Sequence, residues 1–318
     1  MKLISVLSFK GGVGKTTVTW LLARYLVEMR RKTILVVDTD PQMSLITAVE
    51  LLETVGRWDL RFDDWYKQAK TKQSTLYHLL LQYIKSSTIS TPESPLYVHR
   101  PNLYLLPSDE ELYWYNLETP PTSELRKFTA SLLEFIERQG DLPRFDYCFA
   151  DCPPAFNSLS LSVVSHSDLV LIPVNPDIFA SKAVTIMLSG LKKRVEPLPP
   201  FLVFMNRARS RIDKVSGGPM LTRESRKFLI EEVAPAVERE KESGVPIELL
   251  EDVFIPERKG IKDAIAGQRR IPPDLENYFA ELWDRIETHY FPQEIAPAAE
   301  EAAKDVLETG LSEIIGKK

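Results

Sequence analysis

The chain has 318 residues, enough for one large domain or two modest ones, and its 44% hydrophobic and 27% charged content is ordinary for a globular protein. A net charge of −5 argues against a protein whose whole surface binds polyanions, so any nucleic-acid site has to be a local patch. Two cysteines make no disulfide framework, no apolar run approaches membrane-spanning length, and the N-terminus enters a predicted strand too soon for a signal peptide, so we expect a cytoplasmic protein.

A glycine-rich loop follows the first predicted strand, residues 3–7, and precedes an amphipathic helix. The loop, residues 9–17, fits the phosphate-binding pattern G-x-x-x-x-G-K-[ST], except that Phe9 replaces the first glycine and Lys10 adds a second lysine. In this pattern the backbone N–H groups bind phosphate oxygens, Lys15 contacts the β- and γ-phosphates, and the Thr16 hydroxyl ligates Mg²⁺. Strand, loop and helix in this order predict a nucleotide-phosphate site rather than an empty glycine turn.

Two further predicted strands end in carboxylates. The strand at residues 33–37 leads into Asp38 and Asp40, which leave on the same side because they are two residues apart. The strand at residues 145–151 ends in Asp151, which we expect to accept a hydrogen bond from Mg²⁺-bound water or to orient Thr16. Polar residues at the carboxyl ends of parallel strands lie in the ligand crevice of an α/β sheet. Turns rich in Asp and Pro are common, but the nearby phosphate loop favours a functional interpretation.

The two cysteines, Cys148 and Cys152, lie on and just after the strand that ends in Asp151. We interpret them as a core thiol and a loop thiol, because no other cysteine is available to complete a metal site.

The rest of the chain alternates strands with helices. Further strands are predicted at residues 103–107, 169–174, 201–206 and 253–256, and helices at 125–138, from about 178 to 191, from 261 to 266 and at 275–290. This alternation predicts an α/β fold, a doubly wound and mostly parallel sheet with helices on both faces. We expect a single phosphate-loop domain over residues 1–291.

Two segments stand apart from this pattern. Residues 50–100 form a helical and loop insertion, in which Trp58, Trp65 and Tyr66 are interpreted as packing residues rather than a base-stacking platform. Residues 292–318 form a proline-containing linker and a helical tail with an apolar stripe. The acidic balance of the tail disfavours a membrane anchor, so packing on its own domain or on a partner is expected.

Basic residues gather in the C-terminal third. A basic cluster is usually a solvated face, but two clusters in one third of the chain make DNA contact a serious alternative. The candidate DNA-binding residues are Arg207, Arg209, Arg211, Lys214, Arg223, Arg226, Lys227, Arg258, Lys259, Lys262, Arg269 and Arg270.

Taken together, these motifs resemble the ParA/MinD ATPases. Residues 10–17 look like the deviant Walker A loop of that family, residues 38–42 like its D-x-D-P-Q switch I, and residues 151–154 like its D-x-P-P Walker B and switch II. Asn206 and Arg207 also match family features. The resemblance covers roughly residues 1–290, and the D-P-Q and P-P details are most similar to the ParA partition branch.

The resemblance implies a role for each motif residue in binding ATP or ADP with Mg²⁺. Lys10 would be the signature lysine that reaches across an ATP-bound homodimer to the phosphates of the other subunit. Thr16, Asp38 and Asp151 would lie at the metal, and Asp40 would position or polarise the attacking water. The catalytic set is then Lys10, Lys15 and Asp40, and the nucleotide-binding set is Lys10, Gly11, Gly12, Val13, Gly14, Lys15, Thr16, Thr17, Asn206 at adenine and Pro256 beside the base.

The resemblance also implies a biological role. ParA-branch members bind DNA non-specifically as the ATP dimer, associate with the nucleoid and respond to a ParB-like adaptor or activator protein. Plasmid partition, chromosome segregation and the positioning of a carboxysome-like body or a chemosensory cluster all remain open as functions. No membrane partner is expected.

Three alternatives remain. A MinD-like membrane-surface ATPase is the first, and the acidic tail argues against it. A metal-cluster carrier on the same fold would need cysteines that bridge two subunits, and Cys148 and Cys152 are wrongly placed for that. An ATP-dependent amide ligase on a related fold would need a Cys/His amidotransferase site, which is not evident.

Overall fold

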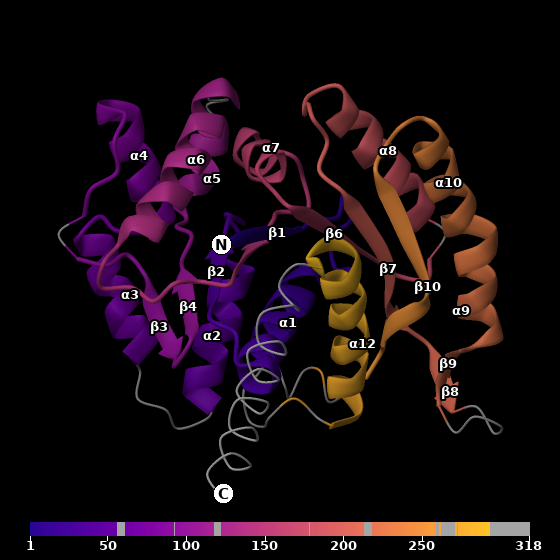
Figure 1. Ribbon diagram of the computed structural model, residues 1–318. Helices are drawn as coiled ribbons and strands as arrows, with labels where there is room; N and C mark the ends of the chain where they lie inside the picture. Colours follow the sequence, from indigo (N-terminus) through magenta and orange to yellow (C-terminus); the bar gives the residue numbers. More distant parts are fainter. Residues whose placement is uncertain are drawn as a thin grey trace, which may run out of the picture.

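The structure is a computed structural model of the chain, shown in Figure 1. It describes residues 1–55, 61–91, 93–117, 122–177, 179–212, 218–258, 261, 271 and 273–292. The predicted helix at 261–266, Trp58 and the predicted tail therefore lie largely or wholly outside the described residues.

In the described part of the chain, eight strands form one sheet in the order β10-β7-β6-β1-β5-β2-β4-β3. Their bounds are β1 Lys2–Val6, β2 Ile34–Asp38, β3 Tyr97–Arg100, β4 Leu103–Leu106, β5 Tyr147–Asp151, β6 Leu169–Val174, β7 Phe201–Ala208 and β10 Ile247–Pro256. All neighbours are parallel except β3, which runs antiparallel to β4 at one edge. A separate hairpin pairs β8, Ser210–Ile212, with β9, Pro219–Leu221. The mostly parallel sheet confirms the predicted fold class.

Helices cover both faces of the sheet (Figure 1). One layer contains α1 Lys15–Arg30, α2 Ser44–Val55, α3 Arg61–Thr71 and α12 Pro273–Tyr290. The other contains α4 Leu76–Ser86, α6 Thr122–Arg138, α7 Ser158–Ser165, α8 Ala180–Lys192 and α10 Ala234–Glu242. The short helices α5 Glu111–Leu117 and α9 Arg223–Phe228 and the π-helix η1 Leu229–Val233 complete the described elements.

The central strands form because their sequences are nearly continuous apolar runs, as a sheet buried on both faces requires. Every residue of β2, β5 and β6 is buried. The register sets Asp38 at the end of β2 beside Asp151 at the end of β5, and Asp151 beside Val6 at the end of β1. The adjacent strands β1, β5 and β2 therefore end side by side, and the candidate site forms at these ends.

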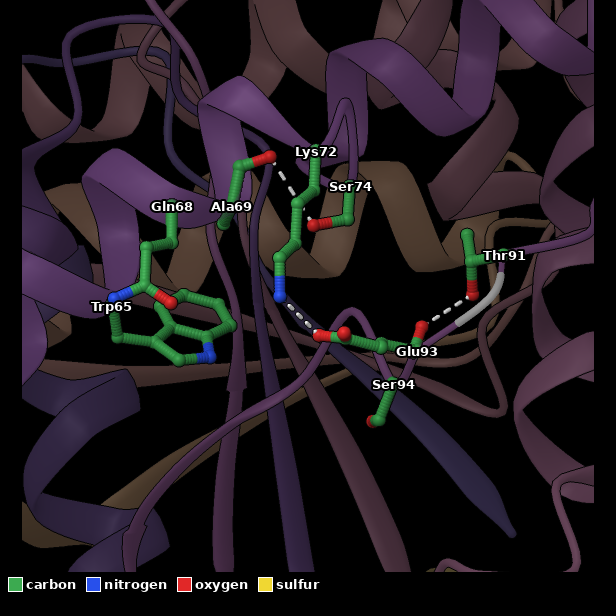
Figure 2. Close-up of a pocket in the computed structure, with 8 residues that line it drawn as sticks. All are labelled: Trp65, Gln68, Ala69, Lys72, Ser74, Thr91, Glu93 and Ser94. Atoms are coloured by element: carbon green, nitrogen blue, oxygen red, sulfur yellow. Dashed lines mark hydrogen bonds and ion pairs between the residues drawn. The ribbon is translucent and has the colours of Figure 1, made fainter.

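Helix α3, which lies in the segment predicted as an insertion, packs on β3 at the edge of the sheet. Trp65 and Phe62 of α3 contact Tyr97 of β3, with ring centroids 5.2 and 4.9 Å away, and Tyr66 belongs to the hydrophobic core. This confirms the packing interpretation of Trp65 and Tyr66. Between α3 and the segment before β3 lies a small polar pocket, bounded on one side by the Lys72–Glu93 ion pair (Figure 2). None of its lining residues belongs to the predicted nucleotide site.

No helix in the described ranges is both long enough and apolar enough to cross a bilayer.

Candidate functional site

The phosphate loop joins β1 to α1 and depends on two glycines with positive φ. Gly12 has φ 75° and Gly14, the residue before α1, has φ 89°, a region that side chains with a Cβ rarely adopt. A Cβ on Gly14 would also lie 2.6 Å from Nδ2 of Asn206 on β7. The loop therefore needs glycine at position 14 for both its backbone conformation and its contact with β7. The N-terminus of α1 points its free N–H groups at this loop, which favours an anion there.

Lys15 and Thr16, the first residues of α1, meet the end of β5. The Thr16 hydroxyl donates to Oδ2 of Asp151 over 2.6 Å, and Thr19 donates to Oδ1 of the same carboxylate over 3.3 Å. Burial lowers the pKa of Lys15, while the negative charges of Asp151 and Asp40 partly oppose this shift. Burial raises the pKa of Asp151 to about 7, against the opposing effects of Thr16 and Lys15.

Asp38, at the end of β2, and Asp40, just after it, lie beside Asp151 and the start of α1. Asp38 is fully buried, its Oδ1 accepts a hydrogen bond from the Asp40 N–H over 3.0 Å, and its Oδ2 has no hydrogen-bond partner among the described residues. Burial, followed by the charge of Asp151, raises the pKa of Asp38 well above its usual range. Asp40 accepts the Gln42 N–H over 2.9 Å, and burial raises its pKa despite the nearby Lys15. Three carboxylates thus share one buried region, with Lys15 close by.

The end of β7 contacts the other side of the phosphate loop. Asn206 is buried and its amide donates to the Val13 carbonyl over 2.6 Å. Arg207 has φ 53°, and its guanidinium donates to the Gly12 carbonyl over 3.1 Å and to Glu257 over 3.0 Å. A long side chain at positive φ is uncommon and is often found at functional sites. Two consecutive residues of β7 therefore hold two consecutive carbonyls of the phosphate loop.

Lys10, the second lysine of the loop, points away from the carboxylates. Its ammonium pairs with Asp177 in the segment between β6 and α8, and lies 5.8 Å from the centre of the Phe179 ring. Its neighbour Phe9 packs edge-on against Phe156, with ring centroids 5.1 Å apart. The two lysines of the loop thus face different surroundings, one buried near the aspartates and one at the rim.

A cavity of about 390 Å³ opens beside these contacts. Asn175 and Asp177 lie on the β6 side, and Arg207 and Glu257 on the β7 side. Pro176, Arg209, Glu224, Ser225 and Phe228 complete the lining, which is mostly polar. The cavity is thus a polar space at the carboxyl edge of the sheet, bordered by residues that hold the phosphate loop.

Comparison with known proteins identifies the family. The model of a family described as "AAA domain" matches residues 1–200, well over half of the chain. The chain belongs to this family. Its curated relatives place it in the ParA/MinD group. They include a putative replication protein A of Rhizobium rhizogenes, 29% identical over 62% of this chain and 46% of its own length. The chromosome partitioning protein ParA of Caulobacter vibrioides is 25% identical over 64% of this chain and 66% of its own length.

Solved structures show the same fold. A complex of a Cyanothece McdA variant with ATP gives a TM-score of 0.58 at 20% identity, over 90% of this chain and 96% of the other. A putative plasmid partition protein of Borrelia burgdorferi bound to AMPPNP gives 0.60 at 18% identity, over 89% and 96%. The match to the two curated relatives spans about half to two-thirds of their own length.

The donor set of this ParA/MinD-family site fits Mg²⁺. In the described residues no three His, Cys, Asp or Glu side chains are grouped closely enough to hold a metal on their own. Mg²⁺ is usually held by one or two protein oxygens, with water and substrate phosphates completing its shell. The unpartnered Oδ2 of Asp38, the carboxylate of Asp151 and the hydroxyl of Thr16 provide such oxygens.

Most of the predicted site residues of this family member come together. Gly12 to Thr16, the three aspartates and Asn206 lie around one loop, and Pro256 ends β10 beside Ala208 of β7. Cys148 and Cys152 are both buried, and burial raises the pKa of each thiol to about 12, as expected of inert thiols. Among the DNA candidates, Arg207 is bound to the phosphate loop, whereas Arg209, Arg211, Arg223, Arg226, Lys227 and Arg258 are exposed. Lys214, Lys259, Lys262, Arg269 and Arg270 lie outside the described residues.

Sequence reasoning gave no role to Asp177, Phe179, Phe156 or Glu257. Asp177 lies shortly after the end of β6, much as Asp40 lies shortly after the end of β2, so the strand-end rule could have found it. Phe156 and Glu257 carry no comparable signal, because their partners Phe9 and Arg207 are distant in the sequence.

Replacing Asp38 by asparagine should stabilise the nucleotide-free protein at pH 8. The folded-state pKa of Asp38 lies above its unfolded value, so ionisation opposes folding at every pH above the unfolded pKa of about 3.9. Asp38→Asn removes that charge and keeps an oxygen for the Asp40 N–H. We expect Tm to rise by several degrees at pH 8 and to change little at pH 4, measured by scanning calorimetry. The exposed Asp141→Asn serves as the control, and a lower Tm for Asp38→Asn at pH 8 would contradict the expectation.

Proposed function

We propose that the chain is a ParA-like ATPase that binds ATP with Mg²⁺, forms an ATP-bound sandwich dimer, and hydrolyses ATP to segregate or position an intracellular cargo. The observation that carries the proposal is the different placement of the two loop lysines. Lys15 lies buried near Asp151 and Asp40, while Lys10 stands at the rim, paired with Asp177. A single chain therefore presents one of these lysines to its own site and keeps the other at the rim, where it can serve a second site.

The residues around Lys15 have the chemistry for phosphate and metal. Lys15 and the N–H groups of the phosphate loop neutralise the phosphates, and Thr16 and Asp151 hold the metal shell in place through their hydrogen bond. Asp38 contributes its unpartnered oxygen to that shell. The metal, when bound, supplies positive charge to the β- and γ-phosphate oxygens.

Asp40 is proposed to orient the attacking water. Its Oδ1 is held by the Gln42 N–H, which fixes the carboxylate at the start of the loop, and its raised pKa suits a group that accepts a proton. Asn206 and the backbone near Pro256 are proposed to border the base, in or beside the 390 Å³ cavity. Thr17 and Gly11 complete the phosphate-binding segment.

Lys10 is proposed to act in the partner subunit. A cation delivered from a second chain stabilises charge that develops on the transferred phosphoryl group and is absent from the monomer, as an arginine finger is. Dimerisation and hydrolysis would then depend on the same residue.

DNA binding is proposed for the end of the molecule that carries β8, β9 and α9 (Figure 1). Arg209, Arg211, Arg223, Arg226 and Lys227 are exposed there, on short elements that extend from the sheet. Phosphate contacts need no sequence code, and a dimer doubles the number of charges. Arg207 contributes less in this proposal because its guanidinium is engaged by Gly12 and Glu257.

The double variant Arg211→Ala/Arg223→Ala tests the DNA surface. We expect roughly tenfold weaker binding of ATP-loaded protein to random duplex DNA at low salt. The slope of log affinity against log salt should become shallower by about 0.9 for each phosphate that the variant no longer neutralises. Fluorescence anisotropy across a salt series measures both quantities.

The control is Lys85→Ala/Lys127→Ala, which removes two exposed lysines from α4 and α6 at the opposite end of the sheet (Figure 1). It should leave DNA affinity nearly unchanged. If ATP-loaded wild-type protein ignored DNA at low salt but sedimented with anionic liposomes, the MinD-like alternative would replace this part of the proposal.

The kind of cargo is proposed from the names of the relatives, and the activating partner is proposed from the resemblance to the ParA branch. Curated relatives carry names such as chromosome partitioning protein ParA, and a solved neighbour is named a plasmid partition protein. We propose a nucleoid-associated protein that responds to a ParB-like adaptor and moves a plasmid, a chromosome or another large body.

A further inference from the structure

The rim lysine, Lys10, is held within its own chain by two groups. Its ammonium pairs with the carboxylate of Asp177 and lies 5.8 Å from the centre of the Phe179 ring. About one third of each charged side chain is exposed, so the pair is partly shielded from water. A cation over an aromatic face gains a further attraction. The Lys10 side chain thus has a defined place in the monomer.

The carboxylate of Asp177, which accepts Lys10, is also held in place by bonds that do not involve Lys10. Oδ1 of Asp177 accepts the Phe179 N–H over 3.0 Å, and its main-chain carbonyl accepts the Ala180 N–H over 3.0 Å. Both bonds tie Asp177 to the start of α8. The other carboxylate oxygen, Oδ2, is the one that accepts Lys10. An acceptor that is already ordered loses little side-chain freedom when the pair forms.

The backbone that carries Lys10 is anchored on its other side. Phe9 packs against Phe156, which lies in the segment after β5. The Phe9–Lys10 dipeptide therefore contacts the segments that follow β5 and β6 at once. When Lys10 leaves Asp177, the phosphate loop gives up one of these two attachments.

We propose that Asp177 is a positioning residue that holds Lys10 inside its own subunit and so sets the protein concentration at which the ATP dimer forms. The inference rests on the proposed function, in which Lys10 acts across the dimer. The inference requires that the Lys10 ammonium leaves Asp177 when it contacts the phosphates of the other subunit. The pair within the chain therefore competes with the contact between chains.

The size of the effect follows from the symmetry of the dimer. When only a fraction of the protein is in the binding-competent state, the apparent affinity is reduced by that fraction. Partly exposed pairs of this kind favour the paired state by a factor of roughly 1.5 to 5. Two lysines are released for each dimer, so the factor enters twice. Removing the pair should tighten the ATP-dependent dimer roughly two- to thirtyfold.

The variant Asp177→Asn tests the inference. Asparagine keeps an oxygen for the Phe179 N–H and removes only the negative charge. Sedimentation velocity with a non-hydrolysable ATP analogue and Mg²⁺, over a range of protein concentrations, gives the dimer dissociation constant. We expect tightening of the size stated above for Asp177→Asn, and no such tightening for Asp177→Glu, which keeps the negative charge.

The matched control is Asp168→Asn. Asp168 also accepts hydrogen bonds from a lysine, Lys2, and from a backbone N–H, that of Leu3, and the exposed fractions of its pair are similar. It lies, however, at the amino ends of the strands, whereas Asp177 lies at their carboxyl ends. It should leave the dimer constant unchanged. Equal tightening by Asp168→Asn would show a general charge effect and overturn the role of Asp177.

A double-mutant cycle separates this inference from the proposed function. Lys10→Gln should remove most of the ATP-dependent dimer, and adding Asp177→Asn should not restore it at any protein concentration tested, because the effect of Asp177→Asn acts through Lys10. If Lys10→Gln alone leaves the wild-type dimer intact, the proposed function fails. If Lys10→Gln weakens the dimer, but the single variant Asp177→Asn has a wild-type or weaker dimer affinity, the proposed function stands and the holding role of Asp177 is wrong.

Discussion

Replacing Lys10 by alanine should leave ATP binding nearly intact while abolishing ATP-dependent dimers. The buried phosphate-binding group consists of Lys15, Thr16 and the loop N–H groups, and Lys10 is not among the contacts that hold it together. Without the cation from the second subunit, hydrolysis should fall by about 10³-fold or more, the range found for cations delivered in trans. Three measurements test whether ATP binding is retained while dimerisation and hydrolysis are lost. They are nucleotide affinity by titration calorimetry, dimerisation by light scattering, and phosphate release.

The control for this variant is Lys2→Ala. Lys2 pairs with Asp168 much as Lys10 pairs with Asp177, but it lies at the start of β1, where the sheet carries none of the predicted site residues. Its removal should affect neither dimers nor hydrolysis. A normal ATP-dependent dimer peak for Lys10→Ala would refute the trans role of Lys10.

Replacing Asp40 by alanine should have the opposite effect on the dimer. Asp40 touches Gln42 and influences Lys15, but the phosphate loop and Lys10 keep all their contacts without it. ATP binding and dimerisation should therefore persist, while the absence of the group that orients water lowers hydrolysis by about 10²- to 10⁴-fold. The dimer should accumulate with ATP and dissociate slowly, which gel filtration followed over time can record.

Asp63→Ala on α3 is the control, since Asp63 is an acidic residue that pairs with the exposed Lys67 one helical turn away. It should turn over ATP at the wild-type rate. An Asp40→Ala protein that stays monomeric with ATP would count against the assignment of Asp40, and so would one that hydrolyses ATP normally.

Several strands of the sheet could be predicted from sequence because burial on both faces leaves a simple signal. The predicted strand at 169–174 coincides with β6, that at 103–107 is one residue longer than β4 at its end, and that at 33–37 is shifted by one residue from β2. The edges were harder. β3, β8 and β9 are short and mixed in polarity, and the first half of β10 contains partly exposed residues, so the prediction found only its last four residues.

In the candidate site, too, some features could be predicted from the sequence and others could not. The carboxylates gather as predicted because parallel strands place their ends together, and the register of β2 with β5 then fixes Asp38 beside Asp151. The contacts that join distant segments carry no such rule. Nothing in the local sequence of Arg207 indicates that it turns back to the Gly12 carbonyl, and its basic neighbourhood suggested DNA instead. Pairing of Lys10 with Asp177 depends likewise on how two loops meet.

The close approach of Gly14 to Asn206 has a consequence for how the site is assembled. The family match ends at residue 200, and the phosphate loop, the switch-like aspartates and Lys10 all precede that point. Yet the carbonyls of Val13 and Gly12 are held by Asn206 and Arg207, which come after it. A chain ending at 200 would keep the Walker A-like, switch I-like and Walker B-like segments and lack the two side chains that brace the loop. The segment that the family model matches is therefore not a self-contained nucleotide-binding unit, because its phosphate loop is held by side chains of β7, a strand that follows it.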